Sequence, residues 1–334
     1  MTIRAVVSST GRYFPGRKVL NSHFYDDLGL ETTEDWIVSR TGIRSRYYVD
    51  RDAGEATAAM ATHAARQCLE RAGLEPSDVD GILIATVTPD HSFPSTACLV
   101  QDSLGARGAF GWDTSAACSG FLFTLAQAAS LVKSGMARRL LVVGSDTMSS
   151  ILDFTDRQTC IIFGDGAGCF LVEAADDDAP GGELLDFVMH VDGSGGESLK
   201  MPAGGSRRPA SAETVAQGLH FVHQDGRTVF KHAVKRMGEV IEELLARNGL
   251  TSDDIGLFIP HQANQRIILA CSKRFKIPME RVMLTLEHWA NTTAATLPTA
   301  LDLALEQGRV QRGDYVVFAT FGAGYTWGAS LLRW

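Results

Sequence analysis

Apolar and polar positions along the chain predict strands that alternate with helices. Nearly continuous apolar runs, such as Gly81–Ala85 and Leu140–Val143, are typical of strands that are covered on both faces. Longer helical patterns lie between these runs, and two of them stop at Gly73 and Gly249 shortly before the next strand. We therefore expect a layered α/β fold with a sheet in each half of the chain.

The pattern also repeats along the chain. Leu69–Val79 and Leu245–Ile255 share the order of helix, glycine, aspartate-containing turn and strand. The same offset pairs Arg138–Val143 with Asp314–Ala319. One such match would be common in any α/β protein, but two matches in register favour a duplicated half.

The repeat divides the chain into an N-terminal half, residues 1–175, and a C-terminal half, residues 217–334. Residues 176–216 between them are rich in glycine and proline. We expect a loop-rich connection there that runs over the surface as a linker or a lid.

Composition and charge narrow the class of protein. With 334 residues, of which 45% are hydrophobic and 21% charged, the chain can bury a large core without disulfides or a metal. A net charge of −8 argues against wholesale binding of nucleic acid. The N-terminus lacks the features of a signal peptide and no apolar run is long enough to span a membrane, so we expect a cytoplasmic protein.

Six cysteines are scattered without the close pairing of a zinc site, so each thiol is judged by its surroundings. Cys118 lies in a run of small residues that ends where the apolar, helix-forming segment Phe121–Val132 begins. At a helix N-terminus, free N–H groups and the helix dipole favour a thiolate, which suits a nucleophile. The alternative is a small buried hydrophobe, which we accept for the other cysteines: Cys68, Cys98, Cys160, Cys169 and Cys271.

A nucleophilic thiol needs a partner that transfers protons or polarises a carbonyl group. His261 follows the apolar run Gly256–Pro260 and opens a helical segment, so it is expected at the carboxyl end of a strand, where α/β proteins bind ligands. A surface histidine that caps the helix is an equally good interpretation from spacing alone. His288 is a rival, while Asn291 is either a hydrogen-bond donor of the site or an ordinary helix cap.

Several segments in one order resemble the β-ketoacyl-acyl-carrier-protein synthase III family of condensing enzymes, which belongs to the thiolase superfamily. The resemblance covers nearly the whole chain and is more specific than any single motif. The segments are Asp113–Phe121, Ile259–Asn264, Asn291–Ala295 and Phe321–Gly328, together with Glu34–Arg44, Thr155–Arg157 and Phe163–Gly168.

The resemblance implies a thiolase-like layered α-β-α-β-α fold built from two duplicated halves, in agreement with the internal repeat. It implies an acyltransferase that condenses an acyl-CoA starter, which we expect to be acetyl-CoA, with malonyl-acyl carrier protein. Carbon dioxide is lost, and the 3-oxoacyl-carrier protein that forms initiates fatty acid biosynthesis. Acyl-CoA acts as a substrate, no cofactor is bound permanently and no metal is needed.

The same resemblance implies roles for individual residues. Cys118 forms a thioester with the acyl group, and the backbone N–H groups of Cys118 and Ala323 hold the oxyanion. His261 and Asn291 donate hydrogen bonds that stabilise an enolate. The family usually has glycine where this chain has Ala323, and a Cβ disfavours a positive φ.

Further matches imply the substrate path and the partners. Trp36 and Arg157 match residues that sandwich the adenine of CoA, and Arg40 lies on the same loop. Phe93 matches a residue that the second subunit of a homodimer inserts into the acyl pocket, although without the resemblance we would expect a core residue. The remaining matches are Asn264 and Gly226 at the pantetheine arm, and Met148 and Phe163 at the acyl pocket.

Basic residues gather on two predicted helices of this acidic chain, one of which follows His261. An acidic acyl carrier protein could dock there, although a run of charges is more often a solvated helix face. The residues are Lys231, Lys235 and Arg236 on one helix and Arg266, Lys273 and Arg274 on the other.

Three other functions stay open on the sequence. One is an acyltransferase of the same fold that passes the acyl group to a hydroxyl or amine in secondary metabolism. A thioester hydrolase could use the same three residue types without a basic docking helix. In a non-catalytic acyl-binding module, Cys118 would be dispensable.

Overall fold

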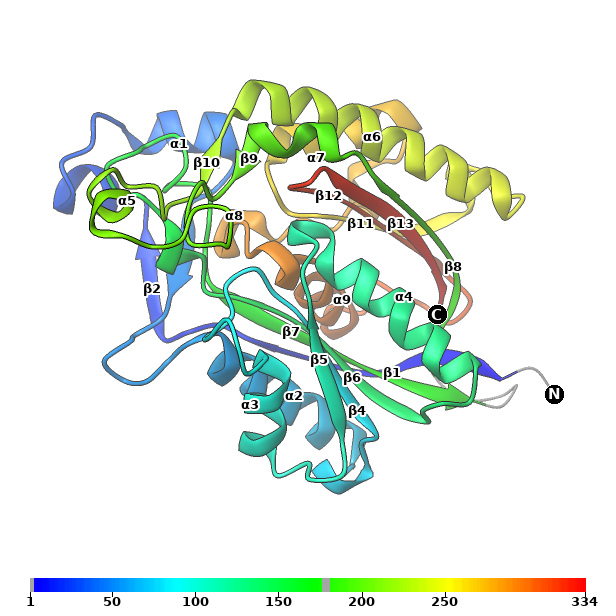
Figure 1. Cartoon of the computed structure of the whole chain (residues 1–334). Coiled ribbons are helices and arrows are strands. Elements are labelled where there is room, and N and C mark those ends of the chain that lie inside the picture. The colour runs from blue at the N-terminus through cyan, green and yellow to red at the C-terminus, as the bar shows by residue number, and fades with distance from the viewer. Residues whose placement is uncertain (1–2, 176–180) are drawn as a thin grey trace.

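The computed structural model describes residues 3–175 and 181–334, which form two halves around a central layer of helices (Figure 1). In the first half, strands lie in the order β5-β4-β6-β7-β1. β4 runs parallel to β5 and β6, whereas β7 is antiparallel to β6 and β1. The elements are β1 (Arg4–Tyr13), α2 (Thr57–Ala72), β4 (Gly81–Ala85), α3 (Thr96–Leu104), β5 (Phe110–Thr114), α4 (Gly120–Lys133), β6 (Arg139–Asp146) and β7 (Gly166–Ala175).

The second half repeats this plan with the strand order β11-β12-β13-β8. β11 is parallel to β12, and β13 is antiparallel to β12 and β8. The elements are β8 (Gly182–Val191), α6 (Gly226–Arg247), β11 (Ile255–Pro260), α7 (Gln265–Phe275), α9 (Thr296–Glu306), β12 (Tyr315–Gly322) and β13 (Thr326–Arg333). The shorter elements of the chain are β2 (Arg17–Leu20), α1 (Glu34–Thr41), β3 (Ser45–Tyr48), β9 (Leu199–Lys200), α5 (Ala212–Ala216), β10 (His223–Gln224) and α8 (Leu286–Trp289).

Helices form three layers and the strands form two layers between them. α2 and α3 pack on the outer face of the first set of strands, and α6 and α7 cover the second set. α4 and α9 lie between the two sets, where Phe121, Leu125 and Leu297 belong to one buried cluster. This arrangement is the expected α-β-α-β-α layering of two similar halves.

The repeat extends to the turns that open the central helices. Short 3-10 turns at Ala117–Ser119 and Thr293–Ala295 precede α4 and α9 and contact each other. Both turns begin with a non-glycine residue at positive φ, Ala117 at 48° and Thr293 at 52°. Such a conformation costs about 1–2 kcal/mol per residue, so its occurrence at equivalent positions shows that both halves hold the same tight turn.

Two expectations about the connection between the halves were wrong. The strands do not form a separate sheet in each half. In the described part of the chain, β1 pairs with β8, and this pairing joins the two sets of strands into one nine-stranded sheet. The predicted loop-rich connection at 176–216 contains the ten-residue strand β8, which pairs along β13. Glycines on both sides of β8 obscured its alternating pattern; residues 176–180 of this connection lie outside the described residues.

Within residues 3–175 and 181–334, no helix combines the length and the apolar character needed to cross a bilayer.

Candidate active site

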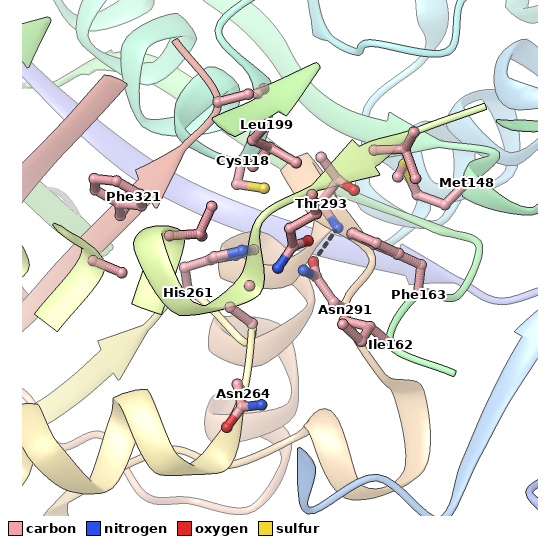
Figure 2. A pocket seen from close by; sticks show the side chains of 18 of the residues that line it. Cys118, Met148, Ile162, Phe163, Leu199, His261, Asn264, Asn291, Thr293 and Phe321 are labelled. Carbon is pink, nitrogen blue, oxygen red and sulfur yellow. Dashed lines mark hydrogen bonds between the residues drawn. The ribbon is translucent and has the colours of Figure 1, made fainter. Parts of the chain in front are cut away.

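A cavity of about 320 Å3 lies where the two halves meet, and its walls come from both of them (Figure 2). This volume is at the lower end of the range for small-molecule sites. Cys118, His261 and Asn291 all line it, and their side chains point toward the same space. Apolar residues supply much of the remaining wall, including Val87, Met148, Ile162, Phe163, Leu199, Val222 and Phe321.

Cys118 is held in the 3-10 turn immediately before α4, as the sequence predicted for a helix N-terminus. Its carbonyl oxygen accepts a hydrogen bond from the Thr320 hydroxyl at 2.9 Å. The Ser119 hydroxyl donates to the carbonyl of Thr326 at 3.0 Å, which ties the turn to the second half. Gly322 passes so close that an added Cβ would lie 2.8 Å from the Cys118 nitrogen.

Burial acts against the thiolate form of Cys118 that the helix dipole favours. Cys118 is only 8% exposed. Burial, followed by the negative charge of Asp146, raises the pKa of the Cys118 thiol to about 12. The sequence pointed to the dipole of α4, which favours a thiolate, but it gave no sign of this burial.

His261 follows β11, and its backbone N–H donates to the carbonyl of Ala319 at 2.8 Å. The ring is buried, with Nδ1 2.7 Å from the Thr296 hydroxyl oxygen. Nε2 is also buried and has no partner within the described residues. Burial lowers the pKa of His261 to about 3, so the ring is neutral near pH 7.

Asn291 is fixed by its own turn and by the neighbouring chain. Its side-chain Oδ1 accepts a hydrogen bond from the Thr293 N–H at 2.9 Å (Figure 2). Its backbone N–H donates to the carbonyl of Ile162 at 3.0 Å. Because Oδ1 is engaged, the side-chain NH2 group is the part that can donate to a ligand. The rival His288 is exposed on α8 and does not line the cavity.

Asp146 is a buried carboxylate next to this site that the sequence analysis missed. Its Oδ1 accepts hydrogen bonds from Val87 N–H at 2.8 Å and from the Thr88 hydroxyl at 2.9 Å, and Oδ2 accepts from Ala294 N–H at 3.1 Å. Burial nevertheless raises the pKa of Asp146 to about 6. The position of Asp146 at the carboxyl end of an apolar strand was the signal that could have revealed it.

The residues matched to CoA divide into two groups. Asn264 and Gly226 line the cavity, and Asn264 donates to the carbonyl of Arg40 at 2.9 Å. Trp36 lies outside the cavity lining, with the guanidinium of Arg40 5.5 Å and that of Arg157 5.0 Å from its ring centre. The structure therefore gathers Trp36, Arg40 and Arg157 into one cluster, in which Arg157 contacts the tryptophan directly.

The other matched residues have clear positions. Phe163 and Met148 are buried in the cavity wall. Phe93 is 86% exposed, so the expectation of a core residue was wrong. Ala323 lines the cavity, and its φ is not positive. Its Cβ therefore causes no backbone strain of the kind that a left-handed conformation would bring.

The basic residues lie on adjacent helices, because α6 and α7 pack together (Figure 1). Lys231 on α6 and Arg266, Lys273 and Arg274 on α7 are all exposed. Arg274 is paired with Glu242 at 2.8 Å, and Arg266 lies over the ring of Phe230, which lines the cavity. Among the described residues, no group of three or more His, Cys, Asp or Glu is arranged to hold a metal ion.

Solved structures share this fold over the whole length of the chain. The 3-oxoacyl-[acyl-carrier-protein] synthase III from Aquifex aeolicus VF5 matches with a TM-score of 0.89 and 39% identity, covering 99% of this chain and 100% of that one. The priming β-ketosynthase from the R1128 polyketide biosynthetic pathway also gives a TM-score of 0.89, at 34% identity, covering 99% of this chain and 96% of that one. The fold and the site define a condensing enzyme of the thiolase superfamily.

Two family models match the sequence. The 3-oxoacyl-[acyl-carrier-protein (ACP)] synthase III model matches residues 112–193, and the model of its C-terminal part matches residues 245–334. The β-ketoacyl-[acyl-carrier-protein] synthase III of Solibacter usitatus (strain Ellin6076) is 53% identical, over 99% of each chain. The chain belongs to the 3-oxoacyl-acyl-carrier-protein synthase III family, whose acyl-transferring members carry out the initiating condensation of fatty acid synthesis.

Proposed function

We propose that this chain joins an acyl group from acyl-CoA to the malonyl unit of an acyl carrier protein, with Cys118 as the acyl carrier. The observation that carries the proposal is the convergence of Cys118, His261 and Asn291 on one cavity. In the first step, the Cys118 sulfur attacks the thioester carbonyl of acyl-CoA. The acyl–sulfur bond to CoA breaks, CoA leaves as its thiol with the proton of Cys118, and an acyl-Cys118 thioester remains.

The oxyanion that forms in this step needs donors in fixed positions. We assign this role to the backbone N–H groups of Cys118 and Ala323. Cys118 is fixed by the turn that Thr320 and Ser119 hold, and Ala323 follows the close approach of Gly322. One such donor is typically worth about 2.7–4 kcal/mol of transition-state stabilisation.

The second step needs donors rather than a base. Malonyl-acyl carrier protein loses carbon dioxide, and its thioester carbonyl oxygen takes on the negative charge of an enolate. His261 is neutral and Asn291 does not titrate, so both suit hydrogen-bond donation to that oxygen. The enolate carbon attacks the acyl-Cys118 carbonyl, the 3-oxoacyl-carrier protein leaves, and the Cys118 thiolate takes up one proton from solvent.

The substrate path runs outward from this centre. We assign the pantetheine arm of CoA to Asn264 and Gly226, which line the cavity, and the adenine to Trp36 with Arg157 and Arg40. The Arg157 guanidinium lies 5.0 Å from the centre of the Trp36 ring, so both groups can contribute stacking and cation–π contacts to an adenine. We propose a short starter, acetyl-CoA, for the acyl pocket near Met148 and Phe163.

A homodimer and a docked carrier protein complete the proposal. Phe93 is 86% exposed, and β5 is an edge strand with exposed Phe110 and Trp112 side chains, as expected for a surface that a second copy covers. We place acyl carrier protein on the basic face formed by Lys231, Arg266, Lys273 and Arg274.

We also propose a cytoplasmic location, which the six free cysteines favour.

Mass spectrometry of the purified protein tests both steps. With acyl-CoA alone, we expect the acyl mass on the Cys118 peptide, and with malonyl-acyl carrier protein we expect a 3-oxoacyl product and carbon dioxide. A panel of acyl-CoA starters of increasing length should give the highest rate with acetyl-CoA. An acyl group on another cysteine, or none, would overturn the scheme.

Two variants separate the roles. Cys118→Ala should lose acylation, whereas Asn291→Ala should still acylate Cys118 and fail to condense. Transfer of the acyl group to a hydroxyl or amine without carbon dioxide would favour the acyltransferase of secondary metabolism instead. Loss of both steps in a folded Asn291→Ala protein would contradict the division of roles.

A further inference from the structure

Among the described residues, the Thr296 side chain at the start of α9 is the only hydrogen-bond partner of the His261 ring nitrogens. Its hydroxyl oxygen is 2.7 Å from Nδ1 of His261 and 3.1 Å from the carbonyl oxygen of Thr293. A threonine hydroxyl has one proton and can donate to only one of these two acceptors. The direction of this one bond therefore decides which ring nitrogen of His261 carries the proton.

The two arrangements have opposite consequences for the cavity. If Thr296 donates to Thr293, Nδ1 must carry the proton, and Nε2 then has only a lone pair. If Thr296 donates to Nδ1, the single proton of the neutral ring is on Nε2. Nε2 is the buried nitrogen that has no partner among the described residues, so only the second arrangement gives a free donor there.

The surroundings favour the second arrangement. The carbonyl of Thr293 already accepts the backbone N–H of Thr296 in the 3-10 turn, so it loses little when the hydroxyl turns away. The contact with Nδ1 is also the shorter of the two. The 3.1 Å to the Thr293 carbonyl is also longer than the usual length of an O–H···O hydrogen bond, about 2.5–3.0 Å, which further favours donation to Nδ1.

We propose that Thr296 is a positioning residue that donates to Nδ1 of His261 and so keeps the proton on Nε2, ready for the thioester carbonyl of the malonyl substrate. The use of that proton rests on the proposed function, but the tautomer is a property of the resting protein. Thr296 itself touches no substrate in this scheme. It acts on the second step and leaves the formation of acyl-Cys118 unchanged.

NMR of the full-length protein labelled with 15N-histidine tests the tautomer directly. We expect the resting protein near pH 7.5 to show a protonated Nε2 and an unprotonated Nδ1 for His261, with His261→Gln used to assign the signals. Thr296→Ser keeps the hydroxyl and should retain this tautomer. Thr296→Val removes the hydroxyl and should give a mixture of tautomers or a protonated Nδ1.

Kinetics supply the second readout. Thr296→Val should lower the rate of condensation by roughly 10- to 100-fold, because a misdirected donor loses part of the usual effect of an oxyanion contact. Cys118 acylation should stay within about twofold of the parent, and Thr296→Ser should restore most of the condensation rate. The matched control is Thr299→Val, one turn along α9, whose hydroxyl donates to the carbonyl of Ala295 at 2.7 Å.

The outcomes separate this inference from the proposed function. A protonated Nδ1 in the resting parent overturns the inference even if the enzyme condenses normally. Parental condensation by a folded Thr296→Val protein overturns it as well, and so does an equal loss in Thr299→Val. If the parent shows a protonated Nε2 but forms no 3-oxoacyl product, the proposed function fails and the tautomer assignment stands.

Discussion

Gly322 gives the sharpest test of how Cys118 is positioned. A Cβ at this residue would lie 2.8 Å from the Cys118 nitrogen, 3.1 Å from the Ser119 nitrogen and 3.2 Å from the Cys118 Cβ. Ordinary contacts begin at 3.4 Å, so Gly322→Ala must push the turn away by about 0.6 Å. Two of these atoms are backbone nitrogens and the third is a Cβ, so a rotamer change moves none of them.

The expected effect follows from that displacement. A misplacement of about 1 Å can lower a rate by about 100-fold, so we expect Cys118 acylation to fall by roughly 10- to 100-fold in Gly322→Ala. Overpacking of this kind also lowers the free energy of unfolding by about 1–3 kcal/mol. Rapid-quench mass spectrometry of the Cys118 peptide measures the acylation rate, and urea unfolding measures the stability.

The matched control is Gly108→Ala, because Gly108 has no atom within 4 Å of an added Cβ and no positive φ. It should acylate Cys118 and unfold as the parent does. A Gly322→Ala protein that is folded and acylates within about twofold of the parent would refute the argument that the closely packed glycine sets the position of the Cys118 amide.

Three further predictions concern the histidine, the adenine cluster and the basic face. Because the folded-state pKa of His261 is about 3 against an ordinary 6.5, protonation favours unfolding as the pH falls below 6.5. In urea unfolding, the parent should therefore lose about 3 kcal/mol more stability than His261→Gln when the pH falls from 7 to 4.5. Trp36→Ala should raise KM for acyl-CoA by roughly tenfold through lost stacking, with little change in kcat. Lys273→Glu should raise KM for malonyl-acyl carrier protein by roughly 3- to 10-fold at low salt, and less at high salt.

Each of these has its own control. The stability difference for His261→Gln should be flat above pH 7, and a difference that does not change with pH contradicts the assigned shift. Trp36→Ala should leave KM for malonyl-acyl carrier protein unchanged, whereas equal changes for both substrates would argue against an adenine site. Lys18→Glu, on β2, is the charge control for Lys273→Glu and should have no effect on carrier binding.

The three residues proposed for the chemistry lie in local motifs, so their positions in the fold were the easiest to predict. Cys118, His261 and Asn291 each lie where an apolar strand or a small-residue run gives way to a helix, and the sequence shows that boundary directly. The duplicated halves were also visible, because the helix, glycine and strand recur in register.

What the sequence did not reveal depends on contacts between distant segments. The link between β1 and β8 requires knowing which strand edges meet, and no local pattern encodes it. The raised pKa of Cys118 comes from burial by both halves, whereas the neighbouring residues alone suggested only the helix dipole. Asp146 and Thr296 act on residues far along the chain, so their own segments look like an ordinary strand end and helix start.

The paired turns before α4 and α9 differ in the residue that faces their central amide. In the repeat, the Ala294 amide corresponds to the Cys118 amide. Asp146 is the last residue of β6 and corresponds to Gly322, which is the last residue of β12. Gly322 presents no side chain to the Cys118 amide, whereas the Asp146 carboxylate at the equivalent position accepts a hydrogen bond from the Ala294 amide. In the proposed mechanism, the turn of one half is therefore available to the substrate oxyanion, whereas a buried carboxylate occupies the equivalent turn of the other half.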